Sequence, residues 1–256
     1  MDDWNKILKE YLRNRPLFLS VLRAKEVSLY QKYLPITHPV LDFGCGDGFF
    51  AKVAFREKVD IGLDVEESRI NEAKMQGVYR KIVIYDGKKI PFKNNYFATV
   101  VSNSVLEHVE CLSDAVYEIN RVLKPGGKFL TTVMTKKWED YLLGAKIFGR
   151  IYKDYMRKKQ VHVNLLTQKE WDEKFKEAGF AIRKIVGHLD KDTCQLLDLL
   201  HYISVPSLIS YKLTGKWIIL PFLADVIYPR KLFIKLSRGN VSPDVSGALF
   251  YELEKK

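Results

Sequence analysis

Cysteine is scarce in this chain, and its spacing argues against the sites that cysteines usually build. Only Cys45, Cys111 and Cys194 occur among 256 residues, and no two of them form a Cys-x-x-Cys pair. Neither a disulfide framework nor a zinc–cysteine site is expected, which fits a reducing, cytoplasmic setting. No pair of His, Cys or Asp residues has convincing ligand spacing along the chain either, so the sequence predicts no metal site.

Long apolar runs are also missing. No stretch reaches the ~18 uninterrupted apolar residues of a membrane span, and the acidic start Met1-Asp2-Asp3-Trp4 leads into no apolar segment of the kind that a secretory signal has. Hydrophobic residues nevertheless make up 47% of the chain, which is enough for a full core. We expect one domain over residues 1–256.

Acidic residues are too few to balance the basic ones, and the formal net charge is +11. Such an excess favours an anionic partner or surface, although a lysine-rich solvated surface would explain it without any partner. Among partners, an acidic acceptor or an anionic membrane is favoured over nucleic acid.

Alternation of short apolar runs with helical patterns predicts an α/β fold. Strands are expected at 40–43, 59–64, 81–85, 97–102, 128–133, 181–186 and 245–253, and helices near 48–57, 66–76, 112–123 and 168–178. Such an order is typical of a mostly parallel, doubly wound sheet with helices on both faces. The chain then divides into an N-terminal helical cap (1–37), a core (38–188), an apolar helical insertion (189–240) and a final strand (241–256).

The most informative segment follows the first of these strands. An apolar run ends at Asp42 and opens into Gly44-Cys45-Gly46-Asp47-Gly48, a pattern that predicts a strand, a glycine turn and the start of a helix. A dinucleotide fingerprint, Gly-x-Gly-x-x-Gly, would need its third glycine at position 49, which is Phe49. A pyrophosphate ligand is therefore disfavoured, and the carboxylate of Asp42 suits an ammonium or sulfonium group better.

An acidic residue followed by Gly-x-Gly-x-Gly resembles the first motif of the class I S-adenosylmethionine-dependent methyltransferases. Three further segments continue the resemblance in order, from about residue 38 to 134, and indicate the small-molecule branch called methyltransferase type 11. They are Asp86-Gly87-Lys88-Lys89-Ile90-Pro91-Phe92, the run from Ser102 to Leu106-Glu107-His108, and the helix and turn from Glu118 to Gly127.

The resemblance implies a seven-stranded sheet whose last strand is antiparallel between strands five and six, and S-adenosyl-L-methionine as cofactor. Asp64 would accept hydrogen bonds from both ribose hydroxyls, or else simply cap a helix. Asp86 would accept the adenine amino group, or else form an Asx-turn. The full set implied to bind the cofactor is Asp42, Gly44, Cys45, Gly46, Gly48, Asp64, Val65, Asp86, Gly87, Asn103 and Ser104.

His108 is the candidate catalytic residue. It is the imidazole expected near the transferred methyl group, and an ordinary pKa near 6.5 suits removal of a hydroxyl proton. Alternatively, Glu107 and His108 only stabilise the loop that carries them. His162 is a second candidate, with a place in the turn before the helix at Thr167 as its structural alternative.

The predicted function is direct methyl transfer to a small-molecule, glycan or lipid-like acceptor, which the positive charge suggests is anionic. Enzymes that methylate nucleic-acid amino groups or cytosine C5 are disfavoured because the chain has no Pro-Pro and no Pro-Cys pair. The alternatives are a non-catalytic cofactor-binding protein and a peripheral membrane module on the same fold. The insertion at 189–240 would be a cap over the acceptor, a surface for a lipid-like acceptor or membrane, or a dimer interface.

Overall fold

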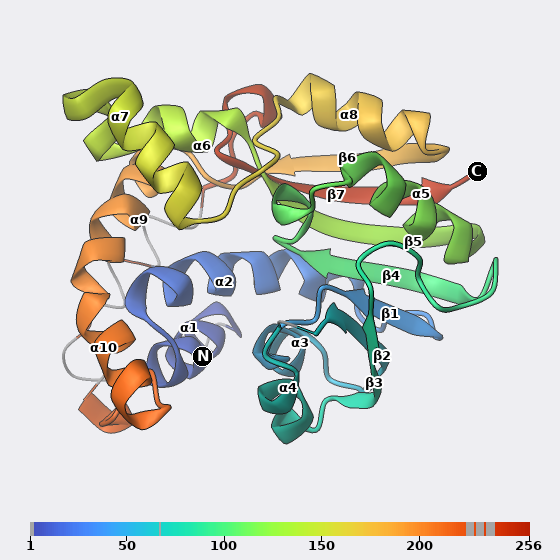
Figure 1. The fold of residues 1–256 in the computed structure, drawn as a ribbon, viewed down its shortest axis with the longest axis horizontal. Helices are drawn as coiled ribbons and strands as arrows, with labels where there is room; N and C mark the ends of the chain where they lie inside the picture. Colours follow the sequence, from blue (N-terminus) through green and yellow to red (C-terminus); the bar gives the residue numbers. More distant parts are fainter. Residues whose placement is uncertain (1–2, 67, 224–227, 229–232, 234–238) are drawn as a thin grey trace.

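A single mixed sheet of seven strands organises the protein, in the order β3-β2-β1-β4-β5-β7-β6 (Figure 1). The computed structural model describes residues 3–66, 68–223, 228, 233 and 239–256. Strand β7 is antiparallel to both of its neighbours and the other pairs are parallel, which confirms the predicted topology. The strands are β1 (Val40–Phe43), β2 (Val59–Val65), β3 (Tyr79–Tyr85), β4 (Phe97–Asn103), β5 (Leu123–Met134), β6 (Phe180–Gly187) and β7 (Ala248–Lys255).

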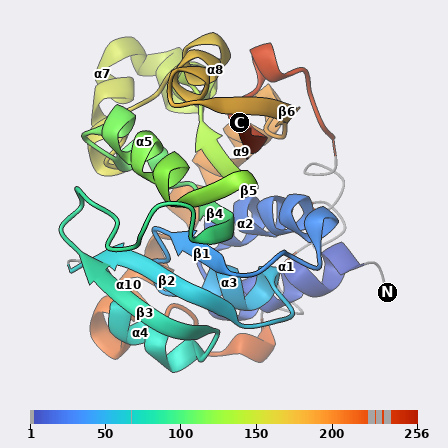
Figure 2. The ribbon, with the colours of Figure 1, turned by 90° about the vertical axis from the view of Figure 1, so that its right-hand side faces the viewer.

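Helices cover both faces of the sheet (Figure 2). Neighbouring strand residues point to opposite faces, so that Val101 packs with α1, α2 and α3, whereas Val100 packs with α5 and α8. The α-helices are α1 (Asp3–Asn14), α2 (Leu17–Tyr30), α3 (Phe49–Ala54), α4 (Ile70–Gln76), α5 (Leu112–Val122), α6 (Lys136–Tyr141), α7 (Leu143–Lys159), α8 (Gln168–Glu177), α9 (Lys191–Ile203) and α10 (Val205–Thr214). Short 3₁₀ turns are η1 (Gln31–Tyr33), η2 (Leu106–His108), η3 (Pro221–Leu223) and η4 (Pro243–Val245).

Several predicted boundaries were wrong by a few residues, each for a local reason. Strand β7 starts at Ala248 rather than at 245, because Pro243–Val245 forms a 3₁₀ turn. Strand β5 starts at Leu123 rather than at 128, and the Pro-Gly-Gly segment is accommodated by a register shift opposite Phe97 and Thr99. Helix α3 ends at Ala54 because Phe55 adopts an extended conformation.

The carboxyl ends of the parallel strands point toward the part of the molecule where α2, α7, α9 and α10 lie (Figure 1). Helix α2 begins after Pro16 and packs against α1 and α9. Asp190 caps α9 by accepting a hydrogen bond from the Thr193 amide at 2.7 Å. Within the described part of the chain, no helix combines the length and hydrophobicity required to cross a membrane.

Candidate active site

The glycine turn between β1 and α3 brings bare backbone to the edge of a cavity. Gly44 and Gly46 have φ of +76° and +55°, a region that side chains rarely occupy. A Cβ on Gly44 would lie 2.5 Å from a methyl group of Val105, whereas a Cβ on Gly46 would meet no atom within 4 Å in the described part of the chain. The turn is therefore closed on one side and open toward a ligand on the other.

That open side is a cavity of about 250 Å³, which we call the glycine-turn cavity. The turn and the end of β4 form its floor, and the N-terminal helices contribute a wall. Its lining is Tyr11, Arg15, Leu19, Arg23, Gly44, Cys45, Gly46, Asp47, Phe49, Phe50, Arg69, Asn103, Ser104, Val105 and Trp217.

A buried carboxylate on α2 ties this wall to the end of β4. Glu26 is fully buried, and its Oε2 accepts hydrogen bonds from Arg23 at 2.5 Å and from Asn103 Nδ2 at 3.0 Å. Its Oε1 accepts a hydrogen bond from Ser104 Oγ at 3.0 Å. Because Glu26 and Asn103 are 77 residues apart, no local pattern in the sequence indicates this contact.

A second acidic residue, Asp47, holds two arginines over the glycine turn. Its Oδ2 lies 2.9 Å from Arg15 Nη2 and 3.1 Å from Arg69 Nη1. The Arg15 guanidinium also sits 4.0 Å from the centre of the Phe49 ring. Helices α1 and α2 are thereby anchored to the start of α3 and α4, and the cavity has a cationic rim.

Asp42 and Asp64 lie behind the turn and support it. The Tyr79 hydroxyl donates a hydrogen bond to Asp42 at 2.6 Å, and burial raises the pKa of this carboxyl to about 7. Asp64 Oδ2 accepts the Gly46 amide at 2.6 Å and Oδ1 accepts the Val65 amide at 2.8 Å, and burial raises the pKa of Asp64 as well. Asp64 thus orients the backbone of the turn directly.

Asp86 is exposed after β3 and forms the Asx-turn that was the structural alternative. Its Oδ1 accepts hydrogen bonds from the Lys88 and Lys89 amides at 3.0 and 3.2 Å, and these bonds lower its pKa. Since Val65 pairs with Tyr85 in the sheet, the Asp64 and Asp86 segments end side by side.

The predicted cofactor residues therefore fall into two groups. Gly44, Cys45, Gly46, Asn103 and Ser104 line the glycine-turn cavity. The remainder lie outside its lining, and their contact with a cofactor stays a prediction; they are Asp42, Gly48, Asp64, Val65, Asp86 and Gly87.

A second cavity, also of about 250 Å³, adjoins the first, and we call it the histidine cavity. The two share Leu19, Arg23 and Ser104 in their linings. The histidine cavity combines an apolar body with a polar cluster, and α2, η2, the end of α7 and α9 enclose it. Its lining is Phe18, Leu19, Leu22, Arg23, Ser104, Glu107, His108, Met134, Trp138, Lys159, Gln160, His162, Leu197 and His201.

The two histidines predicted from the sequence meet in this cavity. The His108 and His162 rings are 5.1 Å apart at their centres, and Glu107 lies beside them, so that one ligand atom of each residue falls within 4.8 Å of the others. Burial lowers the pKa of His108, lowers that of His162 to about 4 and raises that of Glu107 to about 8. The sequence argument against a metal site considered spacing along the chain and missed this cluster, which the fold assembles across 54 residues.

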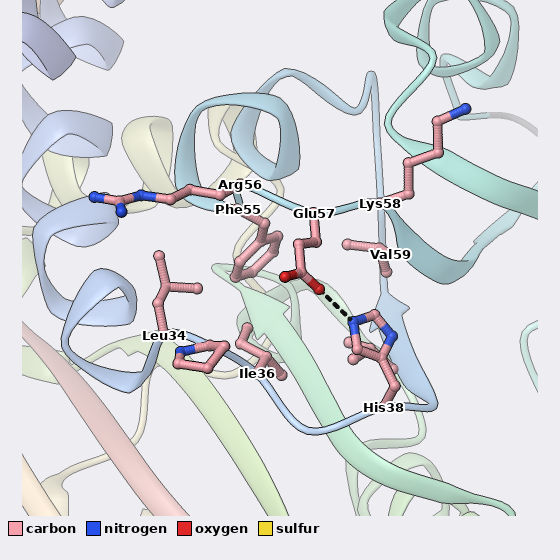
Figure 3. Close-up of a pocket in the computed structure, with 10 residues that line it drawn as sticks. Leu34, Ile36, His38, Phe55, Arg56, Glu57, Lys58 and Val59 are labelled. Carbon is pink, nitrogen blue, oxygen red and sulfur yellow. Dashed lines mark ion pairs between the residues drawn. The ribbon is translucent and has the colours of Figure 1, made fainter.

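A third cavity, of about 260 Å³, lies at the opposite ends of the strands, where β1 and β2 begin (Figure 3). Glu57 points across it toward His38, with 3.5 Å between Oε2 and Nε2, and His38 Nδ1 lies 2.5 Å from Asp60. None of the predicted cofactor residues lines this cavity, so we do not assign the site to it.

The sheet order, the antiparallel last strand and the glycine turn after β1 together define the class I methyltransferase fold. A structure of an S-adenosylmethionine-dependent methyltransferase from Thermotoga maritima, described as a possible histamine N-methyltransferase, superimposes with a TM-score of 0.61. It is 18% identical in sequence, over 99% of this chain and 98% of that one.

Sequence comparison leads to the same family. Residues 41–131 match the family described as methyltransferase domain. An uncharacterized protein from Methanocaldococcus jannaschii is 28% identical over 67% of this chain and 80% of its own length. A ubiquinone/menaquinone biosynthesis C-methyltransferase from Cupriavidus taiwanensis is 32% identical over 40% of this chain, and the match spans only 45% of that relative. Residues 41–131 thus form a methyltransferase domain, and this match, the relatives and the fold together support an S-adenosylmethionine-dependent methyltransferase.

Proposed function

We propose that this enzyme transfers the methyl group of S-adenosyl-L-methionine to a small or lipid-like acceptor held in the histidine cavity. The observation that carries the proposal is the shared wall of the two cavities, formed by Leu19, Arg23 and Ser104. A donor in one cavity and an acceptor in the other would meet at that wall. Direct displacement depends chiefly on such alignment.

The glycine-turn cavity fits the amino-acid end of the cofactor. The open space over Gly46 admits a ligand against the backbone, and the arginines of the rim, Arg15 and Arg69, suit a carboxylate. Asp64 and Asp86 would hold the ribose and the adenine. When bound, the cofactor supplies an electrophilic methyl group on a sulfonium.

The histidine cavity fits an acceptor with an apolar body and a polar or anionic group. Phe18, Leu22 and Leu197 provide apolar walls, and Lys159 adds a positive charge. His108 Nδ1 donates a hydrogen bond to the Val161 carbonyl at 2.9 Å, which leaves the lone pair of Nε2 available. The relative named for ubiquinone and menaquinone biosynthesis agrees with an apolar acceptor.

An exposed apolar surface beside this cavity supports a membrane-derived acceptor. Helices α7 and α10 both contact α9 (Figure 1), and Ile151 on α7 and Leu213 on α10 are 80% and 79% exposed. Lysines of the same helices, including Lys146 and Lys212, are exposed as well. Exposed apolar side chains flanked by basic ones suit an anionic lipid surface. Other exposed large apolar or aromatic side chains on α7, α9 and α10 are Ile147, Phe148, Tyr155, Leu199, Tyr202, Ile203, Val205, Leu208 and Ile209.

Labelled cofactor tests the enzymatic proposal. The protein is incubated with methyl-labelled S-adenosylmethionine and a host extract, which is then separated into lipid, glycan, small-molecule and macromolecular fractions. We expect label in the lipid or small-molecule fraction. Label confined to protein or nucleic acid would contradict the proposed acceptor class.

Vesicle flotation tests the membrane surface. We expect the protein to float with vesicles containing phosphatidylserine and to remain unbound with pure phosphatidylcholine, because attachment needs both charge and apolar contact. Changing Ile151→Ser and Leu213→Ser together should abolish flotation. The control Tyr117→Ser removes an exposed ring from α5 and should float like the wild type. Unchanged flotation of the double variant, or a change in oligomeric state instead, would refute the lipid assignment.

A further inference from the structure

We propose that Glu107, His108 and His162 bind a divalent transition-metal ion, for which Zn²⁺ is the probe, in the wall of the histidine cavity. Two imidazoles and a carboxylate are a donor set that Zn²⁺ and its neighbours in the first transition row accept, while leaving positions open for an exogenous ligand. The three residues lie on η2 and on the segment after α7.

The distances are close to those of a metal site. One ligand atom of each residue lies within 4.8 Å of the other two. Ligands at ~2.1 Å around a tetrahedral ion are roughly 3.4 Å apart, so the side chains need to close by at most roughly 1.4 Å. Side-chain rotations can supply this movement because the backbones of the two segments are already held together.

Hydrogen bonds join the two ligand-bearing segments. The Glu107 carbonyl accepts the Val163 and Asn164 amides at 2.8 and 2.9 Å, and Asn164 Nδ2 donates to the Leu106 and Val109 carbonyls at 3.1 and 2.6 Å. Val161, next to His162, has a φ of +55°, which costs free energy for a β-branched residue. The fold thus sustains a strained turn that places His162 beside His108.

Glu107 is the observation that calls for a ligand. Its side chain is fully buried, and neither carboxylate oxygen makes a hydrogen bond of standard distance and angle within the described residues, although the backbone of Met134 lies near enough to act on it. A buried polar group in that condition is costly and needs a compensating contact. A metal ion would satisfy both this carboxylate and His162 Nδ1, which is likewise buried without a partner in the described structure.

The orientation of His108 and the nearby charges favour the same ligand. His108 Nδ1–H donates to a backbone carbonyl, the arrangement that fixes a metal-binding imidazole with its other nitrogen free. Two arginines whose charges act on the cluster are compensated, because Arg23 pairs with Glu26 at 2.5 Å and Arg157 with Glu139 at 2.6 Å. These ion pairs therefore reduce the electrostatic repulsion between the two arginines and a bound cation.

The chemical role of this ion rests on the proposed methyl transfer. A hydroxyl of the acceptor would coordinate to the ion, lose its proton to solvent more readily and attack the methyl carbon as an oxygen anion. The carbon–sulfur bond breaks, and the products are a methyl ether and S-adenosylhomocysteine. Under this proposal His108 is a ligand rather than the general base.

Metal binding is tested without measuring methyl transfer. Chelator-treated protein is titrated with Zn²⁺ by calorimetry, and Co²⁺ is added separately to record its visible absorption. We expect one ion per chain, with affinity reduced at least tenfold in Glu107→Gln and in His162→Ala. The matched control is His201→Ala, because His201 lines the same cavity outside the cluster. Its affinity should stay within twofold of the wild type.

Two results would overturn the assignment. One is wild-type affinity no higher than that of the Glu107→Gln/His162→Ala double variant, with both proteins shown to be folded by circular dichroism. The other is equal loss of affinity in His162→Ala and His201→Ala. Binding of S-adenosylhomocysteine, measured in parallel, reports on the proposed function independently. Glu107, His162 and His201 line the histidine cavity and are absent from the lining of the glycine-turn cavity.

Discussion

Adding one methyl group at Gly46 gives the sharpest test of where the cofactor binds. Gly46→Ala places a Cβ where no atom of the described residues lies within 4 Å, in the open part of the glycine-turn cavity. Gly77→Ala is a matched control, because Gly77 also has a positive φ, of +65°, and its new Cβ would likewise have no atom of the described structure within 4 Å. Gly77 ends α4 and is not part of the cavity lining.

The two variants should lose similar stability but differ in affinity. A non-glycine residue in the left-handed region costs about 1–2 kcal/mol, which lowers Tm by roughly 2–8 °C in a chain of this size. For Gly46→Ala, the methyl group also intrudes on the ligand. Overpacking of that kind costs typically 1–3 kcal/mol, or a roughly 5- to 150-fold loss of affinity.

Calorimetric titration with S-adenosylhomocysteine measures the affinity, and thermal melting of the same samples measures the stability. We expect weakened binding for Gly46→Ala and wild-type binding for Gly77→Ala, with comparable decreases in Tm. Equal affinities for the two variants would show that the ligand does not approach the backbone at Gly46, and the assignment of this cavity would fall.

Two further predictions concern the carboxylates that support the turn. Asp64→Ala should weaken S-adenosylhomocysteine binding by roughly 2–4 kcal/mol, because the two charge-assisted hydrogen bonds proposed with the ribose would be lost, together with the amide contacts that orient the turn; calorimetry giving an unchanged Kd would refute the ribose role. The raised pKa of Asp42, about 7 in the folded protein against an ordinary 3.8, means that the folded state holds this proton more tightly than the unfolded state. The contribution of Asp42 to the free energy of unfolding is therefore fully present below about pH 4. It is lost as the pH rises to about 7, by up to about 1.4 kcal/mol per pH unit. Asp42→Asn keeps an acceptor for Tyr79 and should lack this slope in denaturant titrations, and parallel wild-type and variant profiles would contradict the burial argument.

Most of the sheet was predictable because its signals are local. Strand β1 has the predicted bounds, since an apolar run and a glycine turn delimit it within a few residues. The start of α2 directly after Pro16 follows a local signal as well, because proline favours the first helical turn and disfavours the interior. Misplaced ends such as the start of β5 depend on pairing with β4, which no single segment encodes.

The candidate site was predictable only where its residues lie in consecutive motifs. Asn103 ends β4, while Gly44, Gly46 and Ser104 follow strands, and the parallel sheet brings strand ends together. Glu26 could not be found in this way, because its partners lie on a different element far along the chain. The position of His162 beside His108 likewise depends on how the segment after α7 folds back onto η2.

The position of α2 between the two cavities has a thermodynamic consequence. Its residues Leu19 and Arg23 face both cavities, and Glu26 fastens it to the end of β4. A ligand that orders α2 from one cavity reduces the entropy that a ligand in the other cavity must lose to order it, so each ligand should raise the affinity for the other. By thermodynamic linkage, the two ligands raise each other's affinity by the same factor. We therefore expect amide hydrogen exchange in residues 17–30 to become slower with each ligand added.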